Sequence, residues 1–522
     1  MDLIHRLELS VLRHPDREFL VDGPLRLTYA EWDRGVNRAA RAYRSLGVRR
    51  GDHVLLALRN REELITSWYG LMKLGAVATP VNHRFSPGEI AFVANDAEAK
   101  VFVFEEVSRE AGVRASADLP GGCRKVYCDA DIPDGCEPLS GLLAAQADAP
   151  PGEKITDDLP CLMLYTSGTT GRPKGVPRLQ RAQGASALAH AVQCGYALGE
   201  RTLGVMPLYH VMGVVSLMTM VLLSGAFIVM RGFDAEGAAA LISRERISSL
   251  YLIPTLFHEL LRAGSIGDHD LSSVRRLAFA GAPMTRALVE ALADRFHPEV
   301  FTNHYGSTEI YTFSINQNLR AKPSSAGRPG IGSALRIVRA DPDGRVSADE
   351  ILPRGEVGEI IADMRSEEAF RGYWRRPDAD EKAFRDGWYF TRDMGYEDED
   401  GDLFVTGRVD DMIISGGENI YPTEVEDILA RHPRVIESAV IGVEDPKWGQ
   451  VVTAFVVPAQ GGEGGEEEGL TPGDIDRHCR EQPDFSDFKR PRKVVFIKKV
   501  PRTASGKILR RMLRAGEYEL DS

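Results

Sequence analysis

The chain has 522 residues, of which 43% are hydrophobic and 27% charged, and its formal net charge is −12. This length allows several compact units with large cores, and the acidic balance argues against a general nucleic-acid-binding role. Charges are scattered through the first twenty residues, so we expect no secretory leader and a cytoplasmic protein. The six cysteines show no CxxC pair, and we expect reduced thiols rather than disulfides or a zinc site.

Strand-like apolar runs alternate with helical patterns in the first half of the chain. Residues 52–58 (DHVLLAL) predict a strand, residues 62–74 (EELITSWYGLMKL) a helix, and residues 75–81 (GAVATPV) a return to extended structure. Apolar runs at 250–253 and 277–280 are likewise followed by helical stretches. Such alternation is typical of an α/β fold in which parallel sheets are covered by helices.

One apolar stretch, residues 211–230 (VMGVVSLMTMVLLSGAFIVM), carries no charge and is long enough to span a bilayer. It is interrupted by Gly213 and by the pair Ser224 and Gly225, and residues 226–230 are typical of a strand after a glycine break. The sequence contains no second segment of this kind. We therefore predict a buried helix, a turn and a strand in a soluble protein.

A second, smaller unit is predicted in the last quarter of the chain. Residues 401–406 (GDLFVT) predict a strand, and Pro422 is well placed to open a helix after it. We predict an N-terminal domain over residues 1–408, a junction at 409–411 and a C-terminal domain over residues 412–522.

The strongest chemical signal lies at residues 164–176, LYTSGTTGRPKGV. Glycines let backbone N–H groups turn toward an anion, hydroxyl side chains add donors, and a lysine supplies positive charge. The motif lacks the GxxxxGK[ST] spacing of the ordinary P-loop, but its ordered composition after an apolar strand disfavours a simple flexible loop. We predict a phosphate-binding loop made of Thr166, Ser167, Gly168, Thr169, Thr170, Gly171 and Lys174.

From this loop onward the sequence resembles the adenylate-forming enzymes, the family of acyl-CoA synthetases, luciferases and peptide-synthetase adenylation domains. The motifs occur in the family's order: YTSGTTGRPKG at 165–175, MPLYHVMG at 206–213, AGAP at 280–283, HYGSTE at 304–309, WYFTRD at 388–393, GRVDDMIISGGENIYP at 407–422 and PRTASGK at 501–507. The residues within these motifs are most similar to those of 4-chlorobenzoate:CoA ligase and other aryl-CoA ligases. The resemblance implies a large N-terminal domain of stacked α/β sheets and a smaller, mobile α+β C-terminal domain.

The HYGSTE motif on its own is typical of a buried turn with one satisfied carboxylate. However, the flat face of Tyr305 suits adenine, and the carboxylate of Glu309 is a hard oxygen ligand suited to Mg²⁺. The resemblance implies that Thr308 contacts the α-phosphate of ATP and that Glu309, helped by Thr169, holds the metal. Further nucleotide-site residues implied by the resemblance are Asp393 and Arg408 at the ribose, and Gly281, Ala282, Pro283, His304, Gly306 and Ser307.

Two more residues are implied to serve the reaction. Lys507 alone reads as one cation of a basic run, but in the family it is the catalytic lysine that neutralises charge between the carboxylate and the α-phosphate. His210 stands at the end of LGVMPLYH, which we predict to be a buried strand, and a lone histidine there is more often a satisfied core residue. The family places it over the acyl pocket, where we expect it to position the carboxylate rather than transfer a proton.

The resemblance implies an acid–thiol ligase with ATP, Mg²⁺ and coenzyme A. The carboxylate of the acid attacks the α-phosphorus and releases pyrophosphate, and the thiol of coenzyme A then displaces AMP. The C-terminal domain is expected to swing about the hinge residue Asp410 between the two steps. The resemblance assigns to coenzyme A a tunnel at Gly416 and Gly417, and the residues Trp448, Phe488, Arg490 and Arg84.

Amino-acid substrates are disfavoured because no acidic residue follows His210 in HVMGVV, where peptide-synthetase domains bind the amine. We predict a closed pocket for one small ring, such as benzoate, hydroxybenzoate or furoate. His304 and Tyr311 stand where the chlorobenzoate ligase has aliphatic side chains, which disfavours a halogenated ring. The other pocket residues predicted are Val211, Met212 and Ile310.

Several alternatives remain open from the sequence. They are an adenylating enzyme that loads a carrier protein, a medium- or long-chain fatty acyl-CoA synthetase and, far behind, a nucleic-acid binder using the basic run 489–514. That run has eleven Lys or Arg and no acid. We expect no nucleic-acid or membrane partner, and the resemblance leaves the choice between monomer and homodimer open.

Overall fold

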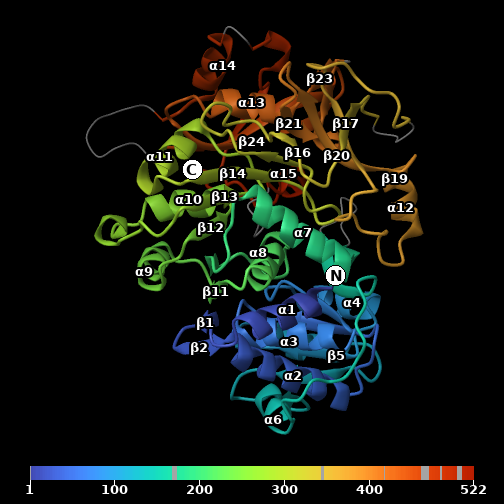
Figure 1. Cartoon of the computed structure of the whole chain (residues 1–522). Helices are drawn as coiled ribbons and strands as arrows, with labels where there is room; N and C mark the ends of the chain where they lie inside the picture. The colour runs from blue at the N-terminus through green and yellow to red at the C-terminus, as the bar shows by residue number, and fades with distance from the viewer. Residues whose placement is uncertain are drawn as a thin grey trace. The chain divides into compact units, whose positions relative to one another are not determined.

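The computed structural model describes residues 2–166, 173–341, 346–416, 418–459, 469–482, 485–502 and 508–521. The chain forms two compact units, one made of residues 1–334 and 363–383 and the other of residues 335–362 and 384–522. Both mix helices with sheets (Figure 1), which confirms the predicted α/β fold with a large N-terminal and a smaller C-terminal part. The predicted junction at 409–411 stays a prediction.

The first unit contains two sheets. One has the order β7 (Glu137–Pro138), β6 (Arg124–Tyr127), β5 (Val101–Phe104), β3 (His53–Ala57), β4 (Val77–Pro80), β8 (Pro160–Thr166) and β9 (Lys174–Leu179). The other has the order β16 (Arg328–Pro329), β15 (Ser314–Asn316), β14 (Val300–Tyr305), β13 (Arg276–Phe279), β12 (Ser249–Leu252), β10 (Arg201–Gly204), β11 (Ala226–Val229), β1 (Glu18–Asp22) and β2 (Leu25–Thr28). The inner strands of both sheets pair in parallel, as predicted.

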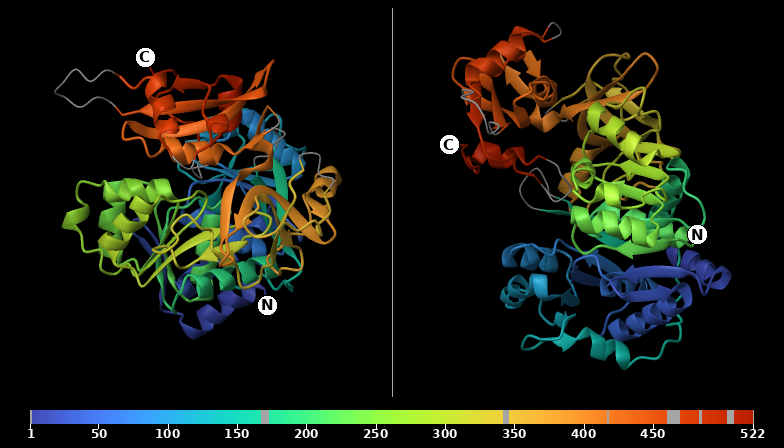
Figure 2. Two further views of the ribbon diagram at one scale, coloured as in Figure 1. Left: turned by 90° about the horizontal axis from the view of Figure 1, so that it is seen from above. Right: turned by 90° about the vertical axis from the view of Figure 1, so that its left-hand side faces the viewer.

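The helices of this unit cover the sheets in layers (Figures 1 and 2). They are α1 (Leu3–Arg13), α2 (Tyr29–Ser45), α3 (Glu62–Lys73), α4 (Pro87–Asp96), α5 (Arg109–Ala115), α6 (Leu139–Ala144), α7 (Gln180–Gln193), α8 (Val211–Leu222), α9 (Ala235–Glu245), α10 (Pro254–Leu261), α11 (Arg286–Phe296) and α12 (Pro377–Ala383). Side chains alternate across β3, so that Val54 and Leu56 join a core with α2, α3 and α8 while Leu55 and Ala57 join one with α4 and α5. Strands buried on both faces explain the continuous apolar runs in the sequence.

The uncharged stretch 211–230 forms α8 and β11, as predicted. Ser224 joins them with a left-handed φ of 47°. A Cβ on Gly225 would come within 2.4 Å of the Glu200 carbonyl oxygen, which explains the glycine break. Within the described residues, we find no helix whose length and apolar character would let it cross a bilayer.

The second unit also holds two sheets. One contains β17 (Leu335–Val338), β18 (Gly358–Asp363), β20 (Trp388–Glu397), β19 (Phe384–Arg385) and β21 (Leu403–Arg408). The other contains β23 (Glu418–Ile420), β22 (Ile413–Ser415), β25 (Gly449–Pro458), β24 (Val435–Asp445) and β26 (Lys493–Phe496), with α13 (Pro422–Leu429), α14 (Pro472–Arg480) and α15 (Arg510–Ala515). Pro422 is the first residue of α13, as predicted.

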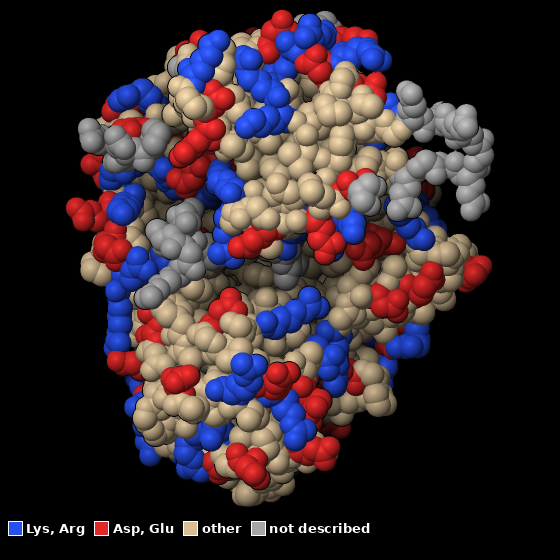
Figure 3. Space-filling model, turned by 180° about the vertical axis from the view of Figure 1, so that it is seen from behind, with Lys and Arg blue, Asp and Glu red and all other residues tan. Residues whose placement is uncertain are grey.

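On the face of the chain seen in Figure 3, acidic and basic side chains are interspersed.

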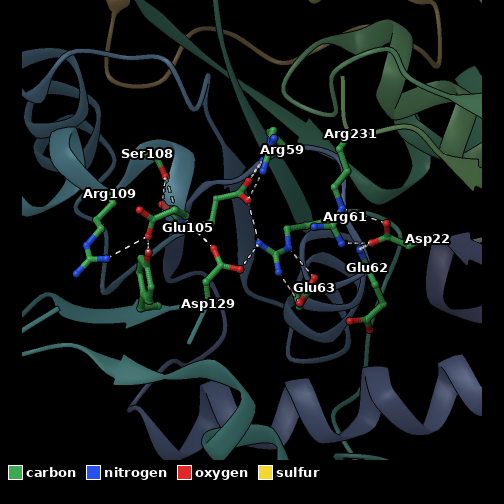
Figure 4. Close-up of polar contacts among 12 residues, drawn as sticks. Asp22, Arg59, Arg61, Glu62, Glu63, Glu105, Ser108, Arg109, Asp129 and Arg231 are labelled. Carbon is green, nitrogen blue, oxygen red and sulfur yellow. Dashed lines mark hydrogen bonds and ion pairs between the residues drawn. The ribbon is translucent and has the colours of Figure 1, made fainter. Parts of the chain in front are cut away.

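A network of ion pairs lies where β3 and β5 end (Figure 4), with Glu105 and Arg61 buried and Arg59, Glu63 and Asp129 partly exposed. Glu105 has no exposed surface, and its carboxylate accepts hydrogen bonds from the Arg59 backbone N–H and from Arg61 Nη1 at 2.9 Å. Arg61 also bonds Asp129 at 3.0 Å and Glu63 at 2.7 Å. The network fixes residues 58–63, and the neighbouring Asn60 donates to the carbonyls of Gly204 and Met206 at 3.0 and 2.9 Å.

We expect Glu105→Gln to lower the free energy of unfolding by about 2 kcal/mol, because Arg61 and the Arg59 N–H lose a charged acceptor inside the protein. The matched control is Glu110→Gln, since Glu110 is exposed and pairs with Arg114 at 3.5 Å on the surface of α5. This control is expected to cost less than about 0.5 kcal/mol. Denaturant unfolding of both variants makes the comparison, and equal losses would contradict the proposed importance of the buried network.

Candidate active site

The predicted phosphate loop connects β8 to β9. These strands form an antiparallel hairpin whose last pair is Thr166 opposite Lys174. Ser167, Gly168, Thr169, Thr170 and Gly171 lie outside the described residues. The pairing of Thr166 with Lys174 holds both ends of the loop, and the Gly175 carbonyl also accepts the Trp374 N–H at 2.8 Å.

The HYGSTE motif begins with His304 and Tyr305, which are the last two residues of β14. A Cβ on Gly306 would lie 1.6 Å from the Tyr311 carbonyl oxygen, so only glycine fits there. The Ser307 N–H donates to the Ile310 carbonyl at 2.9 Å, and the Ser307 hydroxyl accepts the Glu309 N–H at 3.2 Å. The motif is thus a tight turn that presents Thr308 and Glu309 at the end of a sheet strand.

A fully buried arginine on β9 holds this turn. The Arg178 guanidinium donates to the carbonyl oxygens of Thr308 at 3.2 Å and Glu309 at 2.7 Å, and to Gln183 Oε1 at 3.1 Å. Burial lowers the pKa of Arg178 to about 10, so it remains charged at neutral pH. Sequence reasoning missed Arg178, since an arginine at the far end of a loop-flanking strand carries no motif.

Glu309 is the predicted metal ligand, and its carboxylate is held in one orientation. Its Oε1 accepts the Tyr373 hydroxyl at 2.8 Å, and its backbone carbonyl also accepts the Phe370 N–H at 2.9 Å. A carboxylate with one oxygen fixed in this way is a suitable ligand for Mg²⁺, which prefers hard oxygen donors. The residues described here therefore fit the predicted metal; Thr169, the other predicted ligand, is outside the described residues.

The prediction that His210 ends a buried strand is wrong. The strand β10 ends at Gly204, because residues 205–209 turn through Pro207, which has no N–H for a strand ladder. His210 is instead the N-cap residue of α8, at the start of which the predicted pocket residues Val211 and Met212 lie. Burial lowers the pKa of His210 to about 4, which keeps the imidazole neutral at physiological pH.

The predicted ring-pocket residues His304 and Tyr311 lie in a buried cluster of rings. Their ring centroids are 4.4 Å apart, and the Tyr311 hydroxyl is 2.7 Å from that of Tyr251. His304 Nε2 lies 3.1 Å from Thr312 Oγ1, and His304 Nδ1 lies 3.4 Å from His190 Nδ1. The polar atoms of His304, Tyr311 and Tyr251 are therefore bonded to protein, whereas His190 Nε2 has no hydrogen-bond partner among the described residues. Tyr251 and His190 were missed because they are 60 and 114 residues from their partners in sequence.

The remaining predicted residues of the first unit lie on loops or in the core. Gly281 follows β13 with a left-handed φ of 87°, and Ala282 and Pro283 come next. Ile310 is buried. Arg84 follows β4, and its N–H donates to Asn82 Oδ1 at 3.0 Å.

Two predicted nucleotide residues of the second unit meet across a strand pair. Asp393 on β20 is opposite Arg408 on β21, and Arg408 Nη1 donates to Asp393 Oδ1 at 2.7 Å. The predicted hinge residue Asp410 accepts a hydrogen bond from Arg392 at 2.7 Å. The structure thus brings together the acid and the arginine that the sequence assigned to one ribose.

The residues predicted for coenzyme A in the second unit form two groups. The Gly416 N–H donates to the Trp448 carbonyl at 2.8 Å, and a Cβ on Gly416 would lie 2.9 Å from the Trp448 ring. Arg490 pairs with Asp476 and Asp487 beside a cavity of about 430 Å³, and Phe488 is exposed. Gly417 and Lys507 lie outside the described residues.

The chain belongs to the AMP-binding enzyme family. The family profile matches residues 7–374, and the profile of the AMP-binding enzyme C-terminal domain matches residues 424–507. This confirms the predicted resemblance to adenylate-forming enzymes and the predicted class, an AMP-forming acid–thiol ligase.

Similar proteins include a feruloyl-CoA synthase from Amycolatopsis sp., 34% identical over 94% of this chain and 94% of the relative. Others are 4-chlorobenzoate–CoA ligase from Arthrobacter sp. (31%, over 97% and 93%) and the long-chain-fatty-acid–CoA ligase FadD13 from Mycobacterium tuberculosis (32%, over 94% and 93%). Among solved structures, the anthranilate CoA ligase AuaEII in complex with anthranoyl-AMP has a TM-score of 0.87 and 27% identity, covering 99% of this chain and 97% of that one.

The buried carboxyl of Glu368 generates a pH prediction. Its Oε2 accepts the Thr312 hydroxyl at 3.0 Å, and burial raises its pKa to about 7 from an ordinary value of 4.5. Since the folded state holds the proton more tightly, this group's contribution to stability is fully present below about pH 4.5 and is lost as the pH rises through about 7.

We expect Glu368→Gln to be at most as stable as wild type at pH 5, and to gain up to about 3 kcal/mol relative to it by pH 8. Urea unfolding at several pH values measures the difference. The exposed Glu290→Gln, on α11, is the control. A pH-independent difference for Glu368→Gln would show that this carboxyl is ionised in the folded protein throughout the range.

Proposed function

We propose that this enzyme activates a small aromatic or ring carboxylic acid with ATP and transfers the acyl group to coenzyme A. The observation that carries the proposal is the fixed Thr308–Glu309 turn, held by Arg178 beside the hairpin of the predicted phosphate loop. Family membership and similar CoA ligases over nearly the whole chain support the reaction.

In this proposal the chain's own groups bind and orient ATP. Lys174 and the loop residues bind phosphate, Thr308 contacts the α-phosphate, and Tyr305 lies against adenine. Glu309 would hold Mg²⁺ together with Thr169, and the ion would neutralise phosphate charge as pyrophosphate leaves. A similar structure, o-succinylbenzoate CoA synthetase from Bacillus subtilis, was solved with ATP and magnesium ion at 27% identity and a TM-score of 0.83, covering 97% of this chain and 98% of that one.

The acid would be positioned by His210 at the start of α8. A neutral imidazole can donate one hydrogen bond to a carboxylate without taking its proton, which suits positioning of a nucleophile that is already ionised. Lys507 would neutralise the charge that builds up between the carboxylate and the α-phosphate. The thiol of coenzyme A would then displace AMP from the acyl adenylate.

The second unit would supply the groups that change between the two steps. Asp393 and Arg408 would bind the ribose, and a rotation about Asp410 would exchange Lys507 for the coenzyme A residues Gly416, Gly417 and Trp448. The cavity beside Arg490, with Phe488 nearby, supports a nucleotide-binding role for this surface. The domain limits 1–408, 409–411 and 412–522 belong to this proposal, as does the contribution of Arg84.

The buried rings near α8 favour a small ring acid with a polar substituent. Tyr311, Tyr251 and His304 are bulky, so they leave less room for a long acyl chain, and their polar atoms make the wall less apolar. A fatty acyl-CoA synthetase is the second candidate, because FadD13 is as similar to this chain as the aryl ligases are. Pyrophosphate release with a panel of aromatic and fatty acids decides between them, and activity confined to long chains would refute the ring acid.

Lys507→Ala is expected to lose pyrophosphate release from ATP and acid, because charge neutralisation at the α-phosphate is missing. The variant should still convert a synthetic acyl adenylate and coenzyme A to thioester at a near-normal rate. Separate assays of the two half-reactions test this, with Lys499→Ala as a control for the loss of one nearby positive charge. Equal loss of both half-reactions would contradict a role in adenylation alone.

Replacing Tyr311 by Met and Tyr251 by Phe removes both partners of one buried hydroxyl pair, so neither is left unpaired. The double variant is expected to shift kcat/KM toward 4-chlorobenzoate and away from hydroxybenzoate, by about ten- to a hundredfold. Tyr69→Phe, on α3, is the control for loss of a buried hydroxyl elsewhere. An unchanged preference would place the pair outside the acid pocket.

A further inference from the structure

Tyr373 touches two oppositely charged residues of the candidate active site. Its hydroxyl donates to Glu309 Oε1 at 2.8 Å, while Lys174 Nζ lies 4.1 Å from the centroid of its ring. The first contact is a charge-assisted hydrogen bond and the second a cation–π interaction, so one side chain holds both groups by different parts of its structure.

Several contacts hold Tyr373 in place. Its N–H donates to Asp380 Oδ1 at 2.8 Å, and the edge of its ring meets Phe370 at a centroid distance of 5.0 Å. On either side, Phe370 N–H bonds the Glu309 carbonyl and Trp374 N–H bonds the Gly175 carbonyl. The segment 370–374 therefore connects two elements by hydrogen bonds. One is the β8–β9 hairpin, through Gly175, and the other is the turn that carries Glu309, the predicted metal ligand.

Two further contacts anchor this segment. Trp374 Nε1 donates to the Asp96 carbonyl at 2.9 Å, and Arg375 makes a bidentate pair with Glu98 at 2.6 and 2.9 Å. Both Glu98 and Arg375 are held at left-handed φ angles of 52°, which a non-glycine residue adopts only where its surroundings require it. Tyr373 is thus presented from a rigid support rather than from a free loop.

We propose that Tyr373 is a positioning residue that sets the distance and orientation between the loop lysine and the metal-binding carboxylate. The proposal rests on the function proposed above. The hydroxyl fixes Oε1 of Glu309 and so directs the second carboxylate oxygen, while the ring face holds the ammonium of Lys174 at the start of β9. Tyr373 thereby holds the Lys174 ammonium and the Glu309 carboxylate at a fixed separation before the ligand binds. That ligand is a nucleoside triphosphate with its divalent cation.

Single substitutions separate the two contacts. Tyr373→Phe keeps the ring over Lys174 but removes the bond to Glu309, whereas Tyr373→Leu removes both. Tyr373→His keeps a flat ring and restores a polar N–H, so it should recover part of what the Phe variant loses. Tyr127→Phe is the matched control, because Tyr127 lies on β6, away from these residues, and its hydroxyl is bonded to Glu106.

Direct binding is measured first, without any acid or turnover. Mn²⁺ is titrated into protein with ATP and followed by the electron paramagnetic resonance signal of the free ion, and ATP binding is measured separately in EDTA by calorimetry. Tyr373→Phe should weaken Mn²⁺ binding about tenfold and leave metal-free ATP binding unchanged. Tyr373→Leu should in addition weaken metal-free ATP binding about threefold.

Turnover gives the second measurement. The Mg²⁺ concentration for half-maximal rate should rise in Tyr373→Phe, with the KM for the acid unchanged and partial recovery in Tyr373→His. Wild-type Mn²⁺ binding by Tyr373→Phe would overturn the proposal, and so would equal weakening by all three substitutions or by Tyr127→Phe. A wild-type protein that binds Mn²⁺ and ATP but makes no thioester from any acid would instead refute the proposed function.

Discussion

The candidate active site depends on a guanidinium group that has no contact with water. Arg178 stands on β9, at the base of the phosphate-loop hairpin, and its donors point to two consecutive backbone carbonyls of the STE turn. Burying an arginine away from water costs several kcal/mol of free energy unless it is hydrogen-bonded. If the turn moved away, the Arg178 guanidinium would lose its carbonyl acceptors while still buried, so the turn is held in place. Strand β9, which carries Lys174, and the turn that carries Glu309, the predicted metal ligand, are thereby held together.

A buried cation also affects the carboxyl groups around it. Glu368 lies close enough to Arg178 for the positive charge to lower its pKa, yet burial outweighs this effect and raises the pKa to about 7. Through Thr312 the same carboxyl is joined to His304, and from there to His190. Burial holds the pKa of His304 near 3, so this chain of polar groups contains neutral rings rather than additional charges. The imidazole of His304 is therefore polar without being charged, whereas Glu368 becomes charged as the pH rises through about 7.

The sequence predicted the fold well where one rule determined local structure. The helix of residues 62–74, the strand before it and the division of residues 211–230 into α8 and β11 all follow from periodicity and from the glycine break. It failed at His210, because an apolar run does not reveal that Pro207 ends the strand ladder early. For the candidate site, short motifs assigned Thr308 and Glu309 to one turn and Asp393 and Arg408 to one ribose site. The structure brings each pair together, while their roles stay predictions. The motifs did not identify Arg178, Tyr373 or Tyr251, since each acts on a partner that only the folded chain brings near.

Two ion pairs of the second unit lie next to the proposed hinge residue Asp410. Two ion pairs lie side by side where β20 meets β21, Arg392 with Asp410 and Arg408 with Asp393. Arg392 is held at a left-handed φ of 63° by its N–H bond to Glu359, so its side chain is directed at Asp410 by a constrained backbone. In the proposed function, ribose hydroxyls that donate hydrogen bonds to the Asp393 carboxylate compete with Arg408 for that acceptor. Arg408 stands two residues before the proposed hinge residue Asp410. Partly exposed pairs of this kind contribute about 1 kcal/mol or less to stability. Exchanging their partners therefore changes the free energy little compared with the free energy of binding a nucleotide. In the function proposed above, nucleotide binding and rotation about Asp410 are therefore coupled through two adjacent ion pairs, Arg408 with Asp393 and Arg392 with Asp410.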